Sequence, residues 1–217
     1  QQQTRRRVER LMNEMLEEYE QGAYYYQEVL RIKREIPSLD VRNERLFMGL
    51  LVYTGMRPEE VMGLRWEDVH LGKQYAEIKR AVTYPKKNQP VIKGTKTKKS
   101  VRTVILPKAL VEILTPCAES EGFICGGEQP WTWAVMDNIK RRAYKKLRIK
   151  GFSNYDFRST FGTQLKESGL SSAIVADLMG HADTRMVETV YARTRHEGVM
   201  KQLEAVEAIN SGITADL

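Results

Sequence analysis

The sequence has few cysteines, few histidines and no long hydrophobic run. Its 217 residues include two cysteines, Cys117 and Cys125, and three histidines. These are too few for a disulfide framework or a four-ligand zinc site, and they form no CxxC or HExxH pattern. The longest apolar stretch, residues 46–53, is far shorter than the about 20 residues of a membrane-spanning helix. We expect no metal, no cofactor and no membrane segment.

The beginning of the chain also lacks a targeting signal. Residues 1–7 have no apolar core of the kind found in signal peptides. We therefore expect a reduced, cytoplasmic protein. Because the chain does not begin with methionine, we further expect it to be part of a longer protein.

Acidic residues are absent from residues 78–111, although the chain as a whole carries a net charge of +7. The cations within this stretch are Lys79, Arg80, Lys86, Lys87, Lys93, Lys96, Lys98, Lys99, Arg102 and Lys108. A second basic run contains Arg141, Arg142, Lys145, Lys146, Arg148 and Lys150. Such fields of one sign attract polyanions and give salt-dependent phosphate binding. The alternative is two solvated faces of a basic protein, but the clustering favours nucleic acid as the partner.

Hydrophobic periodicity predicts a mainly helical chain with one small sheet. Helices are expected at 4–20, from Gly22 (where an interruption is predicted) to about 34, and at 42–53, 58–64, 107–114, 131–147, 155–167, 171–179 and 196–210. Between them, residues 75–80, 81–84 with 91–92, and 101–106 are short and rich in β-branched residues. These segments predict a small antiparallel three-stranded sheet whose last loop is 94–100, and hence an α+β fold.

One segment has the features of an anion site. In TGMRPEEVMGLRW, residues 54–66, Arg57 follows a glycine turn and stands at the start of a short helix that Pro58 initiates. There a guanidinium can bind an anion beside free backbone N–H groups. The alternative is a surface arginine without a ligand.

This segment resembles the first arginine motif of the tyrosine recombinase (phage integrase) family. Three further segments fit the family pattern in the same order: Lys96–Arg102 ahead of a strand, Tyr155–Gly162, and Leu178–His181 with Tyr191 ten residues later. The resemblance covers about residues 40–195. It implies the tyrosine recombinase catalytic-domain fold over 39–217, preceded at 1–38 by a helical segment or linker from an upstream domain.

The resemblance also implies a role for each matching residue. Tyr191 would be the nucleophile, and Arg57 and Arg158 would bind the non-bridging oxygens of a DNA phosphate. His181 would hydrogen-bond the phosphate or transfer a proton. Lys96 would protonate the leaving 5′ oxygen, and Lys98 and Lys99 of the same loop are the alternatives for this role.

One position departs from the family pattern. Tyr155 stands where the family has histidine, and a phenol with a pKa of about 10 is a poor general base at neutral pH. Glu60 and Asp156 match positions that support the arginines through buried ion pairs, although Asp156 could also be an ordinary surface carboxylate.

The activity implied is site-specific recombination through a 3′-phosphotyrosyl intermediate, without metal or ATP, in integration or excision of a phage or mobile element. The expected partner is double-stranded DNA in a bacterial cytoplasm, bound by a homotetramer whose isolated catalytic domain can be monomeric. The residues expected to contact DNA are Lys79, Arg80, Lys98, Lys99, Arg102, Arg141, Arg142, Lys145 and Lys146. Two alternatives are relaxation of the type IB topoisomerase kind and a DNA-binding module that has lost catalysis.

Overall fold

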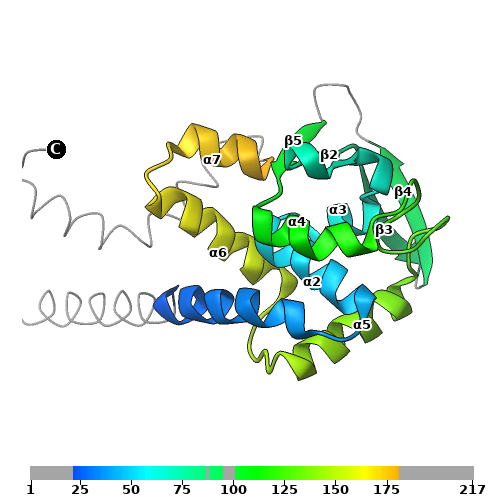
Figure 1. Ribbon diagram of the computed structural model, residues 1–217, viewed down its shortest axis with the longest axis horizontal. Coiled ribbons are helices and arrows are strands. Elements are labelled where there is room, and N and C mark those ends of the chain that lie inside the picture. Colours follow the sequence, from blue (N-terminus) through cyan, green and yellow to red (C-terminus); the bar gives the residue numbers. More distant parts are fainter. Residues whose placement is uncertain (1–21, 87, 95–100, 181–217) are drawn as a thin grey trace, which may run out of the picture.

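The computed structural model describes residues 22–86, 88–94 and 101–180 (Figure 1). The predicted catalytic residues Lys96, His181 and Tyr191 lie outside these residues, as do Lys98, Lys99 and the expected helices at 4–20 and 196–210. In the described part, no helix is long and apolar enough to cross a membrane.

Helices make up most of the described chain. Residues 22–35 are helical, Gly22 included, contrary to the interruption expected there. The turn Ile36–Ser38 (η1), which contains Pro37, then ends this helix. The remaining α-helices are α2 (Arg42–Thr54), α3 (Pro58–Gly63), α4 (Lys108–Leu114), α5 (Trp133–Lys146), α6 (Asn154–Glu167) and α7 (Ser172–Met179). Short 3-10 turns are η2 (Trp66–Asp68), η3 (Leu71–Lys73) and η5 (Thr115–Cys117).

The β structure consists of two antiparallel sheets instead of the single sheet expected. The three-stranded sheet has the order β1 (Val69–His70), β2 (Tyr75–Ile78) and β5 (Arg102–Ile105). The hairpin of β3 (Arg80–Lys86) and β4 (Gln89–Gly94) is a separate two-stranded sheet. A three-stranded antiparallel sheet is thus confirmed, but its third strand is β1, because β3 pairs with β4 alone.

Helix α2 lies at the centre of the core. Its residues from Leu46 to Val52 are all buried, and α4, α5 and α6 pack against it (Figure 1). Val29, Ile32 and Ile36 of the preceding segment are buried in the same hydrophobic cluster. The apolar all-round character of α2 therefore reflects a helix that other elements cover on every side.

Two glycines with left-handed backbone end the helices that border the site. Gly55 (φ +62°) ends α2, and a Cβ there would overlap the ring of Phe161 on α6. Gly180 (φ +64°) ends α7, and a Cβ there would overlap the side chain of Arg102 on β5. Close approach at these two turns brings α3, α6, α7 and β5 together at one place.

Candidate active site

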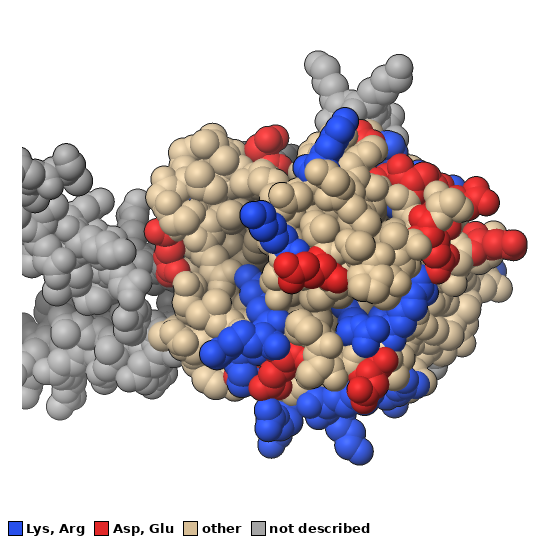
Figure 2. All heavy atoms as spheres, viewed as in Figure 1, with Lys and Arg blue, Asp and Glu red and all other residues tan. Residues whose placement is uncertain are grey.

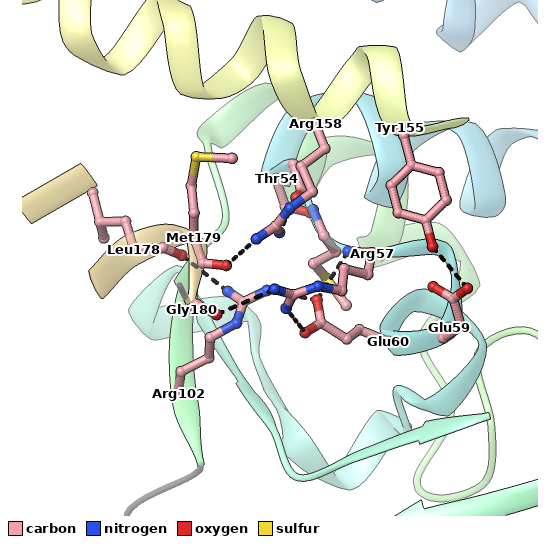
Figure 3. Close-up of polar contacts among 12 residues, drawn as sticks. Thr54, Arg57, Glu59, Glu60, Arg102, Tyr155, Arg158, Leu178, Met179 and Gly180 are labelled. Carbon is pink, nitrogen blue, oxygen red and sulfur yellow. Dashed lines mark hydrogen bonds and ion pairs between the residues drawn. The ribbon is translucent and has the colours of Figure 1, made fainter. Parts of the chain in front are cut away.

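Three arginines from three elements converge on the end of α7 (Figure 3). Arg57 is the N-cap residue of α3, Arg102 begins β5, and Arg158 lies in the second turn of α6. We call these three residues the arginine cluster.

Each arginine donates to a different one of three successive carbonyls. Arg102 Nη1 donates to Leu178 O at 2.9 Å, Arg158 Nη2 donates to Met179 O, and Arg57 Nη2 donates to Gly180 O at 3.3 Å. The last carbonyls of a helix carry partial negative charge and have no partner within the helix. The arginine cluster therefore fixes the C-terminus of α7, directly before His181 in the sequence.

A single carboxylate holds two of the arginines together. Glu60 accepts hydrogen bonds from Arg57 N and Arg57 Nη1, both at 2.9 Å, and from Arg102 Nη2 at 2.6 Å. Its side chain is only 10% exposed. Burial raises the pKa of Glu60, but the charges of Arg102 and Arg57 outweigh burial and leave this pKa below its ordinary value. The ion pair expected between Glu60 and an arginine is present.

Arg158 is buried without an ion pair among the described residues. It is 6% exposed, and Arg158 Nη1 donates to Gly55 O at 2.8 Å. Burial, followed by the charge of Arg57, lowers the pKa of Arg158 to about 10, so it remains charged at neutral pH. Two of the three guanidiniums thus share the carboxylate of Glu60, and the third, Arg158, has no carboxylate partner in the described part of the chain. An oxyanion placed here would relieve their mutual repulsion, and the arrangement is that of an anion site.

Tyr155 lies beside this site but points away from the arginine cluster (Figure 3). Its hydroxyl donates to Glu59 Oε1 at 2.9 Å, and the residue is half exposed. Burial and the hydrogen bond to Glu59 raise the pKa of Tyr155 above its ordinary value. Tyr155 is therefore a protonated phenol at neutral pH, and it cannot accept a proton there.

Comparison with known proteins decides the family. The model of the phage integrase family matches residues 24–197, which is most of the chain. The chain belongs to the phage integrase family. This result confirms the resemblance to the family that the four sequence motifs indicate.

The curated relatives are distant and longer. A XerC-like tyrosine recombinase of Caldanaerobacter subterraneus is 24% identical over 85% of this chain and 52% of its own length. Prophage integrase IntR of Escherichia coli is 27% identical over 64% of this chain and 40% of its own. Tyrosine recombinase XerA of Pyrococcus furiosus is 26% identical over 94% of this chain and 67% of its own length. The chain spans about half the length of the first two relatives.

Solved structures confirm the tyrosine recombinase catalytic-domain fold. The Tn1549 transposon integrase, in complex with a circular intermediate DNA, aligns with a TM-score of 0.65 and 17% identity over 81% of this chain and 62% of its own. The XerA recombinase aligns with a TM-score of 0.60 and 18% identity over 81% and 61%. At these identities the likeness concerns the fold.

In this member of the integrase family, the contacts of Asp156 and Arg102 differ from those expected. Asp156 does not pair with an arginine among the described residues: its carboxylate accepts from Ser153 N at 2.6 Å and closes a capping box at the start of α6. Arg102, expected on the DNA-binding surface, has a side chain that is 13% exposed and belongs to the arginine cluster. The alternation of side chains along the strand could have predicted this position, because Arg102 lies on the same face as the buried Val104. A buried arginine needs polar partners.

The other predicted DNA contacts differ in how far they are neutralised. Asp68, which is 3% exposed on its side chain, ion-pairs with Lys79 and Arg80. Glu44, with a fully buried side chain, ion-pairs with Arg142 and Lys146. Arg141 is well exposed beside Asp137, and Lys145 is exposed with no ion pair in the described part. Figure 2 accordingly shows Lys and Arg side chains interspersed with Asp and Glu on the face in view.

Proposed function

We propose that this chain is the strand-cleaving part of a site-specific DNA recombinase or integrase. The observation that carries the proposal is the arginine cluster, in which the half-buried Arg57 and the buried Arg158 both donate to carbonyls at the end of α7, directly before His181 in the sequence. A DNA phosphodiester is the substrate class that such a site suits. Membership of the phage integrase family supports the same substrate.

The proposed reaction is an in-line exchange of two phosphate esters. Tyr191 Oη forms a bond to phosphorus while the bond to the 5′ oxygen breaks, which leaves a 3′-phosphotyrosyl enzyme. Arg57 and Arg158 bind the non-bridging oxygens, whose charge grows in the transition state. Lys96, or Lys98 or Lys99 in its place, gives the leaving 5′ oxygen a proton.

The proton of Tyr191 needs an acceptor other than Tyr155, whose pKa is raised. We assign this role to His181, because an imidazole with a pKa of about 6.5 can accept a proton at neutral pH. The 5′ hydroxyl of a partner strand then reverses the first step. Bond energy is conserved in the phosphotyrosyl ester, so the exchange needs no ATP, and the guanidiniums provide the charge stabilisation without a metal ion.

The biological setting is proposed from the relatives. The names prophage integrase IntR and Tn1549 transposon integrase support integration or excision of a phage or mobile element. Such DNA lies in the bacterial cytoplasm, and exchange between two sites suits a homotetramer on double-stranded DNA, with a monomer in its absence.

The test is an SDS-stable adduct between the chain and nicked DNA duplexes that it has selected from a randomised library. A nick near the scissile phosphate lets the short leaving strand diffuse away, so the adduct accumulates. We expect Tyr191→Phe to abolish the adduct while DNA binding persists. Tyr24→Phe, at an exposed tyrosine in the first described helix, is the matched control and should form the adduct normally. An adduct with Tyr191→Phe would contradict the assignment of the nucleophile.

The raised pKa of Tyr155 favours one alternative function, that of a DNA-binding module without catalysis. Binding without any adduct from the unaltered chain would support this alternative. Supercoil relaxation without recombinant products would instead indicate activity of the topoisomerase kind.

A further inference from the structure

An open pocket of about 470 Å³ lies next to the arginine cluster and plays no part in the proposed reaction. It is lined by Glu59 of α3, Thr83 and Tyr84 of β3, and Trp133 at the start of α5. Glu59 stands two residues after Arg57, so a ligand in this pocket would lie near a phosphate held by the cluster.

Two aromatic rings form one wall of the pocket. The rings of Tyr84 and Trp133 meet edge to face, with centroids 5.8 Å apart. Tyr84 Oη donates to Trp131 O at 2.8 Å, and Asn88 Oδ1 accepts from Ala134 N at 3.0 Å, which ties the β3–β4 hairpin to the start of α5. Trp133 is nevertheless 41% exposed. The wall is held in place, and Trp133 presents part of its apolar ring to solvent.

Two polar atoms of the lining residues have no hydrogen-bond partner among the described residues. They are Glu59 Oε2 and Thr83 Oγ1, and both are shielded from solvent. The other oxygen, Glu59 Oε1, already accepts from Tyr155 Oη. A buried polar atom without a hydrogen-bond partner destabilises the free protein. A ligand that brings a hydrogen-bond donor to Glu59 would remove this penalty.

The charge of Glu59 narrows the class of ligand. A carboxylate repels phosphate, and its unpaired oxygen needs a hydrogen-bond donor, so the DNA group that suits the pocket is the amino group of a base edge. In the major groove, guanine presents two acceptors, thymine presents an acceptor, and adenine presents an acceptor beside its amino group. Cytosine presents an amino donor without a neighbouring acceptor. The carboxylate therefore discriminates in favour of cytosine, while the aromatic wall can contact the apolar part of the base.

We propose that Glu59, with Thr83, Tyr84 and Trp133, forms a specificity pocket that binds the amino edge of a cytosine close to the cleaved phosphate. This inference rests on the proposed function, because it takes DNA as the ligand. It adds a sequence preference at one base pair.

The experiment is a selection of duplexes from a randomised library by the unaltered chain and by Glu59→Gln, followed by sequencing. We expect the unaltered chain to enrich cytosine at one position. We expect Glu59→Gln to enrich adenine there, because glutamine pairs with the N6 and N7 atoms of adenine. Tyr155→Phe removes the Tyr155–Glu59 hydrogen bond but keeps the carboxylate, so it should retain the cytosine preference.

A second measurement replaces the selected cytosine by pyrimidin-2-one, which lacks only the exocyclic amino group. The affinity of the unaltered chain for DNA should fall about five- to tenfold, which is the low end of the range expected for the loss of one contact to a base. Glu59→Gln should show no such loss, and it also controls for the weaker base pair of the analogue. The inference is overturned if both proteins select the same bases or lose affinity equally, while DNA binding itself still supports the proposed function. If the unaltered chain binds no duplex, the proposed function fails, and this inference fails with it.

Discussion

At the scale of single residues, Glu60 is the group on which the arrangement of the arginine cluster depends most. Its carboxylate accepts from two guanidiniums and one backbone N–H. Removing one partner of a buried ion pair costs about 3–5 kcal/mol. We expect Glu60→Ala to lower the free energy of unfolding in urea by about this amount. Glu128→Gln, at an exposed carboxylate, should change it by less than about 0.5 kcal/mol.

The lowered pKa of Glu60 makes stability depend on pH. A carboxyl group with a lower pKa in the folded than in the unfolded state contributes stability above its unfolded pKa. This contribution is lost as the pH falls through the folded pKa. In urea titrations between pH 7 and pH 3, we expect the unaltered chain to lose more stability than Glu60→Gln. Equal losses would show that Glu60 titrates alike in both states.

Arg158 is the member of the arginine cluster that has no ion pair among the described residues. Because lysine cannot reach Gly55 O and Met179 O together as the guanidinium does, Arg158→Lys should slow adduct formation by at least about 100-fold, as expected for the loss of one preorganised donor. Arg141→Lys, at an exposed position, should leave the rate within about twofold. The readout is the initial rate of SDS-stable adduct at saturating DNA.

Tyr155 should not take part in proton transfer, because its pKa is raised and its hydroxyl is bound to Glu59. We expect Tyr155→Phe to keep the pH dependence of adduct formation. Tyr155→His would add a group with a pKa of about 6.5 at this position. If Tyr155→Phe loses one limb of the pH profile, Tyr155 is a catalytic acid or base after all.

At the scale of elements, the junction between α7 and the arginine cluster depends on Gly180. Gly180→Ala places a Cβ at φ +64° and against Arg102, whereas Gly151→Ala places one at φ +72° in open space. Both variants should lose stability through backbone strain, by roughly 1–3 kcal/mol. Only Gly180→Ala should also slow adduct formation, because it displaces Arg102 and the end of α7. Equal effects of the two variants on the rate of adduct formation would show that the position of the end of α7 does not affect the reaction.

Most helices were predictable because their apolar residues recur with a helical period. The helices found at Arg42–Thr54, Trp133–Lys146 and Ser172–Met179 lie within two residues of the predicted bounds. The sheet was less predictable. Strand β1 has only two residues, too few to show an alternation, and its pairing with β2 leaves the β3–β4 hairpin outside that sheet. Strand pairing is a tertiary contact that local sequence does not encode.

The same distinction applies to the site. Arg57, Glu60 and Arg158 were found because their motifs match a family pattern, and the structure brings them together. The position of Arg102 depends on its contact with Glu60, 42 residues earlier in the chain. The capping role of Asp156 was visible in the sequence as Ser153 followed three residues later by an acid.

At the scale of the whole molecule, net charge overstates the surface available to DNA. Lys79, Arg80, Arg142 and Lys146 are ion-paired with buried carboxylates, whereas the exposed Lys145 has no ion pair among the described residues. We expect Lys145→Ala to reduce the slope of log affinity against log salt concentration by about 0.9, the value for one phosphate contact. Lys79→Ala should change this slope less. The reverse order would show that the paired lysine is the one that faces DNA.

The proposed reaction forms a phosphotyrosyl link at Tyr191, with the phosphate bound by the arginine cluster. The most direct measurement is mass spectrometry of the adduct after nuclease and trypsin digestion. Cleavage after Arg185 and Arg193 releases residues 186–193, a peptide whose one tyrosine is Tyr191. We expect a nucleotide mass on this tyrosine. Tyr191→Phe should give no such mass, and Arg158→Lys should form the adduct at a much lower rate. A nucleotide attached to any other residue, or an adduct formed equally well without Arg158, would contradict the proposed reaction.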